Sequence, residues 1–200
     1  MNVGVLASGT GTNLQALIDR AHGREGVVLC GVASDTPGAR ALERASAAGI
    51  DAEVFTGFAD RASRDAAMVD WLRSRDVELV VLAGYMQLVG ESFVAAFPDR
   101  VINVHPALLP AFPGLGAVQQ ALDYGVKVFG VTVHFVDAGV DSGPIICQRA
   151  VELPDATDAE AVLEALHPIE HELLVDAVRW IARGAVRFDP ANPRRVAISR

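Results

Sequence analysis

The sequence has 200 residues, of which 51% are hydrophobic and 21% are charged, and its formal net charge is −8. Such a chain can bury a substantial core and carries too few charges to be disordered. Because an acidic chain repels phosphate backbones and anionic headgroups, we expect neither nucleic acid nor a membrane surface as a partner. No apolar stretch approaches the roughly 20 residues of a membrane span, and the N-terminus shows no signal-peptide pattern.

The cysteines and histidines do not predict a metal site. Cys30 and Cys147 lie in apolar runs and are too few for a disulfide framework, so we interpret them as buried free thiols. His167 and His171 have the i,i+4 spacing of zinc ligands on a helix, but Pro168 lies between them and the order is not His-Glu-x-x-His. We therefore expect no metal, and the composition favours a reducing cytoplasm as the location.

The first half of the chain, residues 1–100, alternates short apolar runs with helical patterns, which is typical of a parallel sheet covered by helices on both faces. The apolar runs predict four strands, at 3–7, 27–33, 52–55 and 79–82. The helical patterns predict three helices, at 12–21, 38–48 and 63–73. We expect Ser63 to be the N-cap of the third helix.

The second half, residues 101–188, has a different pattern. In order, it predicts a strand, an irregular Pro/Gly-rich stretch, a helix, two longer strands and a long helix: 101–105, 106–114, 117–124, 128–136, 144–151 and about 158–183. The loop between the two longer strands is too short for a crossover helix, which predicts an antiparallel pair. The whole chain, 1–200, is thus predicted to be one three-layer α/β domain with a mostly parallel twisted sheet. Its N-terminal half is Rossmann-like, and we expect a ligand crevice at the carboxyl ends of the strands.

A glycine-rich turn of sequence SGTGTN connects the first strand to the first helix at residues 8–13. Its glycines let backbone N–H groups approach a ligand, and the start of the helix adds donors and a partial positive charge that favour an anion. We interpret Gly11, Thr12 and Asn13 as a monophosphate site. A dinucleotide loop would have a third glycine where Leu14 stands, so NAD binding is a weaker alternative even though Asp35 could hold a ribose. A plain structural turn is the other alternative.

The chemistry is predicted at Asn103, His105 and Asp141. Side chains alternate along a strand, so Asn103 and His105 share a face, with Cβ atoms roughly 6.5 Å apart, and Pro106 ends the strand at a crevice edge. An amide that donates to a developing oxyanion and an imidazole that exchanges protons near neutral pH suit a reaction through a tetrahedral intermediate. Asp141, in a glycine-bounded loop, is placed to orient that imidazole.

Taken alone, the spacing Asn-x-His-Pro is weak evidence, because a single histidine on a strand is more often structural. The sequence offers no nucleophile, since Gly-x-Ser-x-Gly is absent and neither cysteine has a basic neighbour. A phosphosugar- or nucleotide-binding module without catalysis, which would use only the glycine-rich turn, is therefore an alternative function.

Four motifs in order carry a resemblance to a known family. They are residues 8–14 (SGTGTNL), 83–86 (AGYM), 103–110 (NVHPALLP) with 112–114 (FPG), and 133–136 (VHFV) with 140–145 (VDSGPI). The chain resembles the phosphoribosylglycinamide formyltransferases, also called glycinamide ribonucleotide transformylases, over about residues 1–183. The resemblance implies a sheet of about seven strands, the formyltransferase fold, with 106–128 as a mobile loop.

The resemblance implies direct transfer of a formyl group from 10-formyltetrahydrofolate to the amine of glycinamide ribonucleotide in purine biosynthesis, without a metal or a covalent enzyme intermediate. Asn103 would hold the formyl oxygen as it becomes an oxyanion, and His105 would donate a proton. Asp141 would keep His105 protonated and help to relay the proton through water. The partners would be these small molecules, and a homodimer is left open.

By position in the motifs, the resemblance also implies binding residues. The substrate side comprises Gly11, Thr12, Asn13 and Glu170, and the folate side comprises Arg64, Met86, Gln87, Leu88, Val89 and Asn103. The second half, 101–188, would be the catalytic and folate-binding half. Gln87 replaces a frequent arginine, Ala111 a frequent lysine and Gly116 a frequent histidine, so these departures concern folate binding and the loop.

Two relatives of the family are rival interpretations. Methionyl-tRNA formyltransferase shares Asn-x-His-Pro but adds a tRNA-binding domain, for which we expect this chain to be too short and too acidic. Formyltetrahydrofolate hydrolase is the closer rival and normally has an added N-terminal domain, whereas the first predicted strand here starts near the first residue. Release of formate without glycinamide ribonucleotide would indicate the hydrolase.

Overall fold

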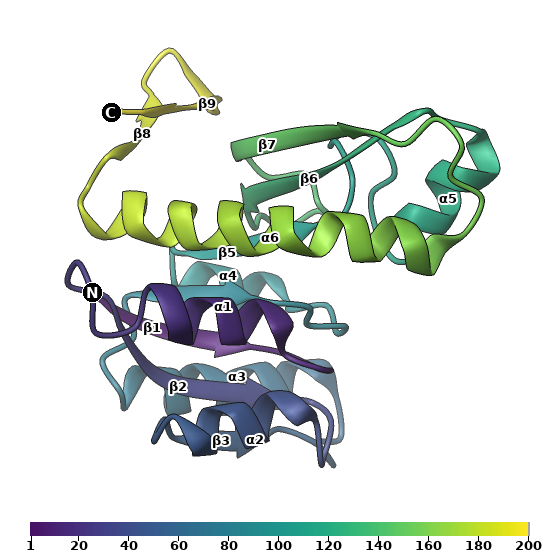
Figure 1. Cartoon of the computed structure of the whole chain (residues 1–200). Coiled ribbons are helices and arrows are strands. Elements are labelled where there is room, and N and C mark those ends of the chain that lie inside the picture. The colour runs from purple at the N-terminus through teal and green to yellow at the C-terminus, as the bar shows by residue number, and fades with distance from the viewer. Residues whose placement is uncertain (200) are drawn as a thin grey trace. The chain divides into compact units, whose positions relative to one another are not determined.

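The computed structural model describes residues 1–199, and Figure 1 shows its helices and strands. Seven strands form one sheet in the order β3-β2-β1-β4-β5-β6-β7, and two further strands form a separate hairpin. The prediction of an α/β fold with a mostly parallel sheet of about seven strands is confirmed. The contacts divide the chain into two compact units, Met1–Asn103 and the residues from Val104 onward, which are described in turn.

The first unit contains the parallel part of the sheet. Its strands are β1 (Asn2–Leu6), β2 (Val28–Ser34), β3 (Ala52–Val54), β4 (Leu79–Leu82) and the start of β5 (Val101–His105). Each of the four pairs β1–β2, β1–β4, β2–β3 and β4–β5 is parallel. The residues of β4 are all buried, which explains why this strand reads as a continuous apolar run.

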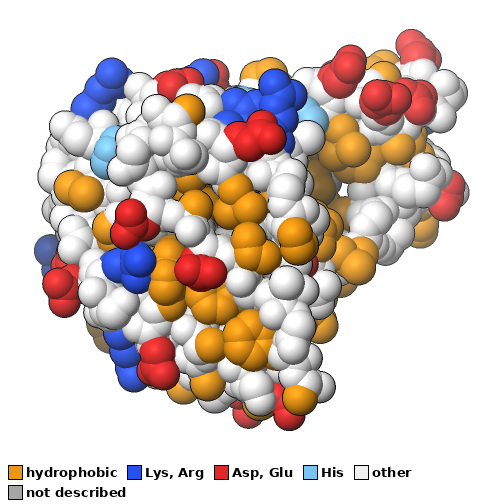
Figure 2. Space-filling model, turned by 90° about the horizontal axis from the view of Figure 1, so that it is seen from below, with side chains coloured by type: hydrophobic (Ala, Val, Ile, Leu, Met, Phe, Trp, Pro, Cys, Tyr) orange, Lys and Arg blue, Asp and Glu red, His pale blue; other side chains and the backbone are white. Residues whose placement is uncertain are grey.

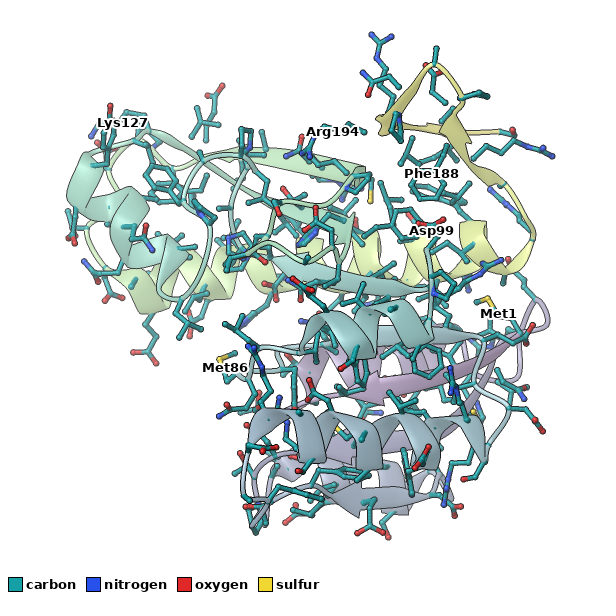
Figure 3. All side chains as sticks on the ribbon, turned by 180° about the vertical axis from the view of Figure 1, so that it is seen from behind. Met1, Met86, Asp99, Lys127, Phe188 and Arg194 are labelled. Carbon is teal, nitrogen blue, oxygen red and sulfur yellow. The ribbon has the colours of Figure 1, made fainter. Side chains whose placement is uncertain are left out.

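The helices of the first unit are α1 (Thr12–Arg20), α2 (Arg40–Ala47), α3 (Arg61–Arg73) and α4 (Glu91–Ala96). Figures 1 and 3 show α1 and α2 on one face of the parallel strands and α3 and α4 on the other. The prediction that Ser63 caps α3 is wrong, because Asp60 is the N-cap and its carboxylate accepts from the N–H of Ser63. The short helix α4 was not predicted, because six residues are too few to show helical periodicity.

The second unit contains α5 (Ala117–Tyr124), β6 (Val128–Phe135), β7 (Ile145–Glu152), α6 (Ala159–Ala182), β8 (Val186–Asp189) and β9 (Asn192–Ile198). The predicted antiparallel pairing of β6 with β7 is confirmed, and its register shifts between Val133 and His134. The long helix α6 packs on β6 and β7. The hairpin of β8 and β9 was not predicted, because none of its strand residues is buried and the sequence shows no apolar run there. Within residues 1–199, no helix is both long and apolar enough to cross a membrane.

Candidate active site

His105 and Asp141 lie together in the second unit. His105 is the last residue of β5, and Asp141 belongs to the loop 136–144 between β6 and β7. Nδ1 of His105 lies 3.4 Å from Oδ2 of Asp141. The sequence placed these two residues in one site, and the geometry brings them within reach of each other.

The other nitrogen of His105 also faces an acceptor. Nε2 lies 2.8 Å from the carbonyl oxygen of Phe112, and because a carbonyl can only accept, Nε2 carries a hydrogen in this arrangement. The carboxylate at Nδ1 and the carbonyl at Nε2 together fix the orientation of the ring. The ring is only 5% exposed. His105 is therefore covered by the Phe112 segment rather than open at a crevice edge, as the sequence had suggested.

Asp141 is held from two sides besides His105. Its Oδ2 accepts from the N–H of Gly114 at 2.7 Å, and its Oδ1 lies 3.5 Å from Nε2 of His134. Nδ1 of His134 lies 2.8 Å from the carbonyl oxygen of Phe135, which fixes the orientation of the ring. Asp141 itself has φ 49, a left-handed conformation that is uncommon for a residue with a side chain. The carboxylate is thus placed by backbone geometry and by three neighbours.

These neighbours keep Asp141 ionised. Burial has the largest single effect and raises the pKa, but the hydrogen bond from His134, the Gly114 N–H and the charges of both histidines together lower it to about 2. At neutral pH Asp141 is therefore a carboxylate, and it lies 3.4 Å from the His105 imidazole. This arrangement can store a proton at His105 and deliver it to an acceptor.

His134 was missed by the sequence reasoning, which quoted the motif that contains it without giving it a role. The shift of register between Val133 and His134 re-aims the side chain of His134, and this bulge leaves no periodic signal in the sequence. The loop after β6 also requires a glycine at position 143, since a Cβ atom on Gly143 would stand 1.8 Å from the carbonyl oxygen of Phe135. The spacing of a glycine eight residues after Phe135 does not reveal this approach.

Asn103 belongs to the first unit and lies two residues before His105 on the same strand. It pairs with Leu82 of β4 and is half-buried. Side chains of a strand alternate, so Asn103 and His105 share one face of β5. Glu170 lies in α6 of the second unit and is buried, with 6% of its surface exposed.

The glycine-rich turn forms the N-terminus of α1. Gly11 is the N-cap residue with φ 70, and a Cβ atom there would stand 2.8 Å from Cα of Ala41, so only glycine fits. Because Gly11 has no side chain to cap the helix, and the first turn contains no acidic residue, no side-chain cap is present. The turn is braced by Arg44, whose Nε donates to the carbonyl oxygen of Thr10 at 2.8 Å. The helix start thus offers backbone donors and a positive end to an anion.

A pocket of about 550 Å³ lies in the first unit. Four of the residues implied for folate line it: Arg64, Met86, Gln87 and Leu88. Val89 and Asn103 are not among its lining residues. The pocket wall also includes Phe55, Phe58 and Arg61, none of which the sequence reasoning had singled out.

Arg64 pairs with residues of the first unit. Its guanidinium makes a 2.8 Å ion pair with Asp65, and Nη2 donates to the carbonyl oxygen of Leu88 at 2.7 Å. Asp65 in turn accepts from the N–H of Gly90 at 2.6 Å. Arg64 therefore shapes the segment that carries Met86 and Leu88, while the exposed Arg61 is the cation whose side chain faces solvent in the pocket wall.

Among the residues that the structure describes, no group of three or more His, Cys, Asp or Glu side chains could hold a metal ion. Cys147 is half-buried, and burial raises the pKa of its thiol to about 12. At neutral pH this thiol is protonated and is a poor nucleophile.

Parallel strands with a glycine turn before the first helix, together with a buried histidine–carboxylate pair, define an α/β enzyme that can move protons. Residues 1–178 match the family model described as formyl transferase, and the chain belongs to this family. The phosphoribosylglycinamide formyltransferase of Bacillus subtilis (strain 168) is 41% identical over 184 residues, covering 88% of this chain and 92% of the relative. The protein of the same name from Mycobacterium tuberculosis (strain ATCC 25618 / H37Rv) is 45% identical over 186 residues, covering 91% and 85%.

Solved structures agree with the family. Glycinamide ribonucleotide transformylase 1 from Symbiobacterium toebii has a TM-score of 0.94 and 45% sequence identity, covering 100% of this chain and 94% of that chain. A formyltetrahydrofolate deformylase from Burkholderia mallei ATCC 23344 has a TM-score of 0.86 and 29% identity, covering 100% of this chain but 70% of that chain. The transformylase is thus the more similar of the two in sequence and in extent.

Proposed function

We propose that this chain transfers the formyl group of 10-formyltetrahydrofolate to the amine of glycinamide ribonucleotide, a step of de novo purine biosynthesis. The observation that carries the proposal is the carboxylate of Asp141, which lies 3.4 Å from His105, the last residue of the strand that also bears Asn103. Formyl-transfer chemistry needs an oxyanion donor and a proton carrier, and relatives at 41–45% identity are named for this reaction.

The proposed reaction is a direct attack. The substrate amine forms a bond to the formyl carbon, and the carbonyl oxygen becomes an oxyanion that the Asn103 amide stabilises by donating a hydrogen bond. The tetrahedral intermediate then breaks its bond to N10 of the folate, which takes a proton from the His105 imidazolium. The proton lost by the attacking amine returns to His105 through water, and Asp141 holds the ring in place while its charge changes.

The substrate roles follow from the chemistry of the described groups. Gly11, Thr12 and Asn13 bind the ribonucleotide phosphate at the start of α1, because backbone donors and the helix dipole favour an anion. Glu170 contacts the glycinamide part. We divide the chain into a phosphate-binding half, residues 1–100, and a catalytic half, residues 101–188.

The pocket of the first unit is proposed to take the folate. Its wall is partly apolar, with Phe55, Phe58, Met86 and Leu88, and this part suits an aromatic ligand. The charged residues of the wall are Arg61 and Arg64 as well as Asp35 and Asp60. Because these residues precede residue 100, part of the folate site belongs to the first half and not only to 101–188. Gln87, Val89 and Asn103 complete the proposed folate contacts.

The proposed partners are the two small substrates, and a homodimer and a cytoplasmic location are part of the same proposal. Figure 2 shows acidic and basic side chains interspersed over the face that it draws. With a net charge of −8, such a surface does not attract a polyanion, so we propose no role for nucleic acid.

The main alternative is a formyltetrahydrofolate hydrolase, in which water replaces the amine. The test is a spectroscopic assay with a formylfolate analogue, run with and without glycinamide ribonucleotide. Deformylation that requires glycinamide ribonucleotide and yields its formyl derivative supports the transferase. Formate release at the same rate without that substrate would establish the hydrolase, and binding without turnover would leave only a phosphosugar-binding module.

A further inference from the structure

The C-terminal hairpin of β8 and β9 is attached to the loop that carries Asp141. Nη2 of Arg194, in β9, donates a 2.7 Å hydrogen bond to the carbonyl oxygen of Ser142, the residue directly after Asp141. Figure 3 shows the labelled Arg194 reaching from the hairpin toward the strands of the second unit. All three residues belong to this unit, so the contact lies within one compact body.

A second attachment lies on the other side of the loop. The rings of Phe188, in β8, and Phe135, at the end of β6, have centroids 4.9 Å apart. Phe135 is only 4% exposed and directly follows His134. Strands β7 and β9 also lie against each other. The hairpin therefore contacts the residue that follows Asp141 and the residue that follows His134.

Hydrogen bonds within the loop 136–144 hold it only in part. Asp137 accepts from the N–H of Gly139 at 3.0 Å and from the hydroxyl of Ser142 at 2.6 Å, which ties the two ends of the loop together. Asp141, between them, has the unfavourable φ of 49. A residue in such a conformation keeps it only when its surroundings hold it there. The Arg194 bond acts on the peptide unit next to that residue.

We propose that Arg194 is a positioning residue, which fixes the Asp141 loop so that the carboxylate meets His105. The proposal rests on the proposed function for its kinetic consequences. The hairpin, residues 186–198, lies beyond the residues 1–178 that match the family model, so this support is supplied by a segment outside the matched domain. Arg194 touches no substrate and acts through the loop alone.

The test compares Arg194→Ala and Arg194→Lys with Arg195→Ala. Arg195 is the next residue of β9 and is exposed, so its replacement removes the same charge but leaves the bond from Arg194 to Ser142 in place. Arg194→Ala should lower kcat by roughly 10- to 100-fold with little change in KM, because a small misplacement of a catalytic group affects the chemical step. Arg194→Lys should restore part of kcat, since an ammonium can still donate to the Ser142 carbonyl. Arg195→Ala should match the wild type.

A titration that needs no turnover separates this proposal from the proposed function. In protein labelled with ¹³C at aspartate carboxyls, with the Asp141 signal assigned through Asp141→Asn, the Asp141 midpoint should rise in Arg194→Ala and stay unchanged in Arg195→Ala. If the Asp141 midpoint rises in Arg194→Ala but the wild-type protein transfers no formyl group, only the proposed function is overturned. Equal Asp141 midpoints in all variants, or a kcat loss matched by Arg195→Ala, would overturn the positioning role of Arg194.

Discussion

Nε2 of His134 lies 3.5 Å from Oδ1 of Asp141, the carboxylate oxygen that does not face His105. One carboxylate thus lies between two imidazoles, one of which is oriented by a backbone carbonyl. His105 is the ring proposed to give up a proton, whereas His134 is buried with 1% of its surface exposed. His134 is therefore placed to hold the carboxylate while His105 changes its charge.

Replacing His134 tests this arrangement. In His134→Gln the imidazole that lowers the pKa of Asp141 is replaced by a side chain of similar reach, so the pKa of Asp141 should rise and its geometry should loosen. We expect kcat to fall by about 10- to 100-fold with KM for both substrates nearly unchanged. Steady-state kinetics check this outcome, and a variant that lowered only the affinity for a substrate would contradict the role given to His134.

Replacing Asn103 tests the oxyanion donor. Asn103→Ala removes one hydrogen-bond donor from the proposed intermediate and should lower kcat by roughly 100- to 1,000-fold. The half-buried side chain contributes little to the core, so the circular dichroism spectrum should stay that of the wild type. Turnover near the wild-type level in a folded Asn103→Ala protein would exclude Asn103 from the chemistry.

The carboxylate of Asp141 also predicts a pH dependence of stability. Its folded-state pKa is about 2 against an ordinary value of 3.8, so the ionised form is favoured by folding. The resulting stabilisation is present above pH 3.8 and is lost as the pH falls toward 2. Because Asp141 is partly exposed to solvent, we expect a contribution on the order of 1 kcal/mol.

Denaturant unfolding of the wild type and of Asp141→Asn measures this contribution. The two free energies of unfolding should differ most near neutral pH and converge as the pH approaches 2. A difference that stayed constant over this range would show that the charge of Asp141 does not contribute. The same variant should shift or narrow the pH profile of kcat, since it removes the carboxylate that lies 3.4 Å from His105.

Gly11 tests the anion site at the start of α1. Gly11→Ala forces a side chain into a left-handed conformation and against the backbone of Ala41, so we expect destabilisation of about 1 kcal/mol or more and weaker binding of the phosphate-bearing substrate. Gly9→Ala, in the same turn, is the control for stability because its Cβ would meet nothing within 4 Å. Urea unfolding and calorimetric titration with glycinamide ribonucleotide measure the two effects. Unchanged values for Gly11→Ala would contradict the assignment.

The parallel part of the sheet could be predicted from the sequence because buried strands read as uninterrupted apolar runs. Leu79–Leu82 is the clearest case, since all four residues are buried. The N-cap of α3 could not be predicted, because Asp60 and Ser63 are both residue types that cap helices. Only the hydrogen bond from the N–H of Ser63 to Asp60 decides between them. The β8–β9 hairpin could not be predicted either, because its packing on β7, and not a pattern in its own sequence, stabilises it.

The central residues of the candidate site could be predicted from the sequence, but the groups that surround them could not. His105 follows from its place at the end of a strand, and Asp141 from its glycine-bounded loop. The Phe112 carbonyl on His105 and the His134 ring beside Asp141 depend on a long irregular segment and on a bulge, neither of which leaves a periodic signal. The end of its strand predicted His105 at a crevice edge, but the ring is covered by the segment that follows its own strand.

The most direct test of the account is the single-turnover rate of formyl transfer to glycinamide ribonucleotide by His105→Gln. Glutamine can still donate to the Phe112 carbonyl, so the buried position keeps a hydrogen-bonding side chain, but it cannot act as an acid near neutral pH. We predict a rate at least roughly 100-fold below that of the wild type, in a protein that still binds both substrates. A folded His105→Gln protein that transferred formyl at the wild-type rate would contradict the central role of His105 and Asp141.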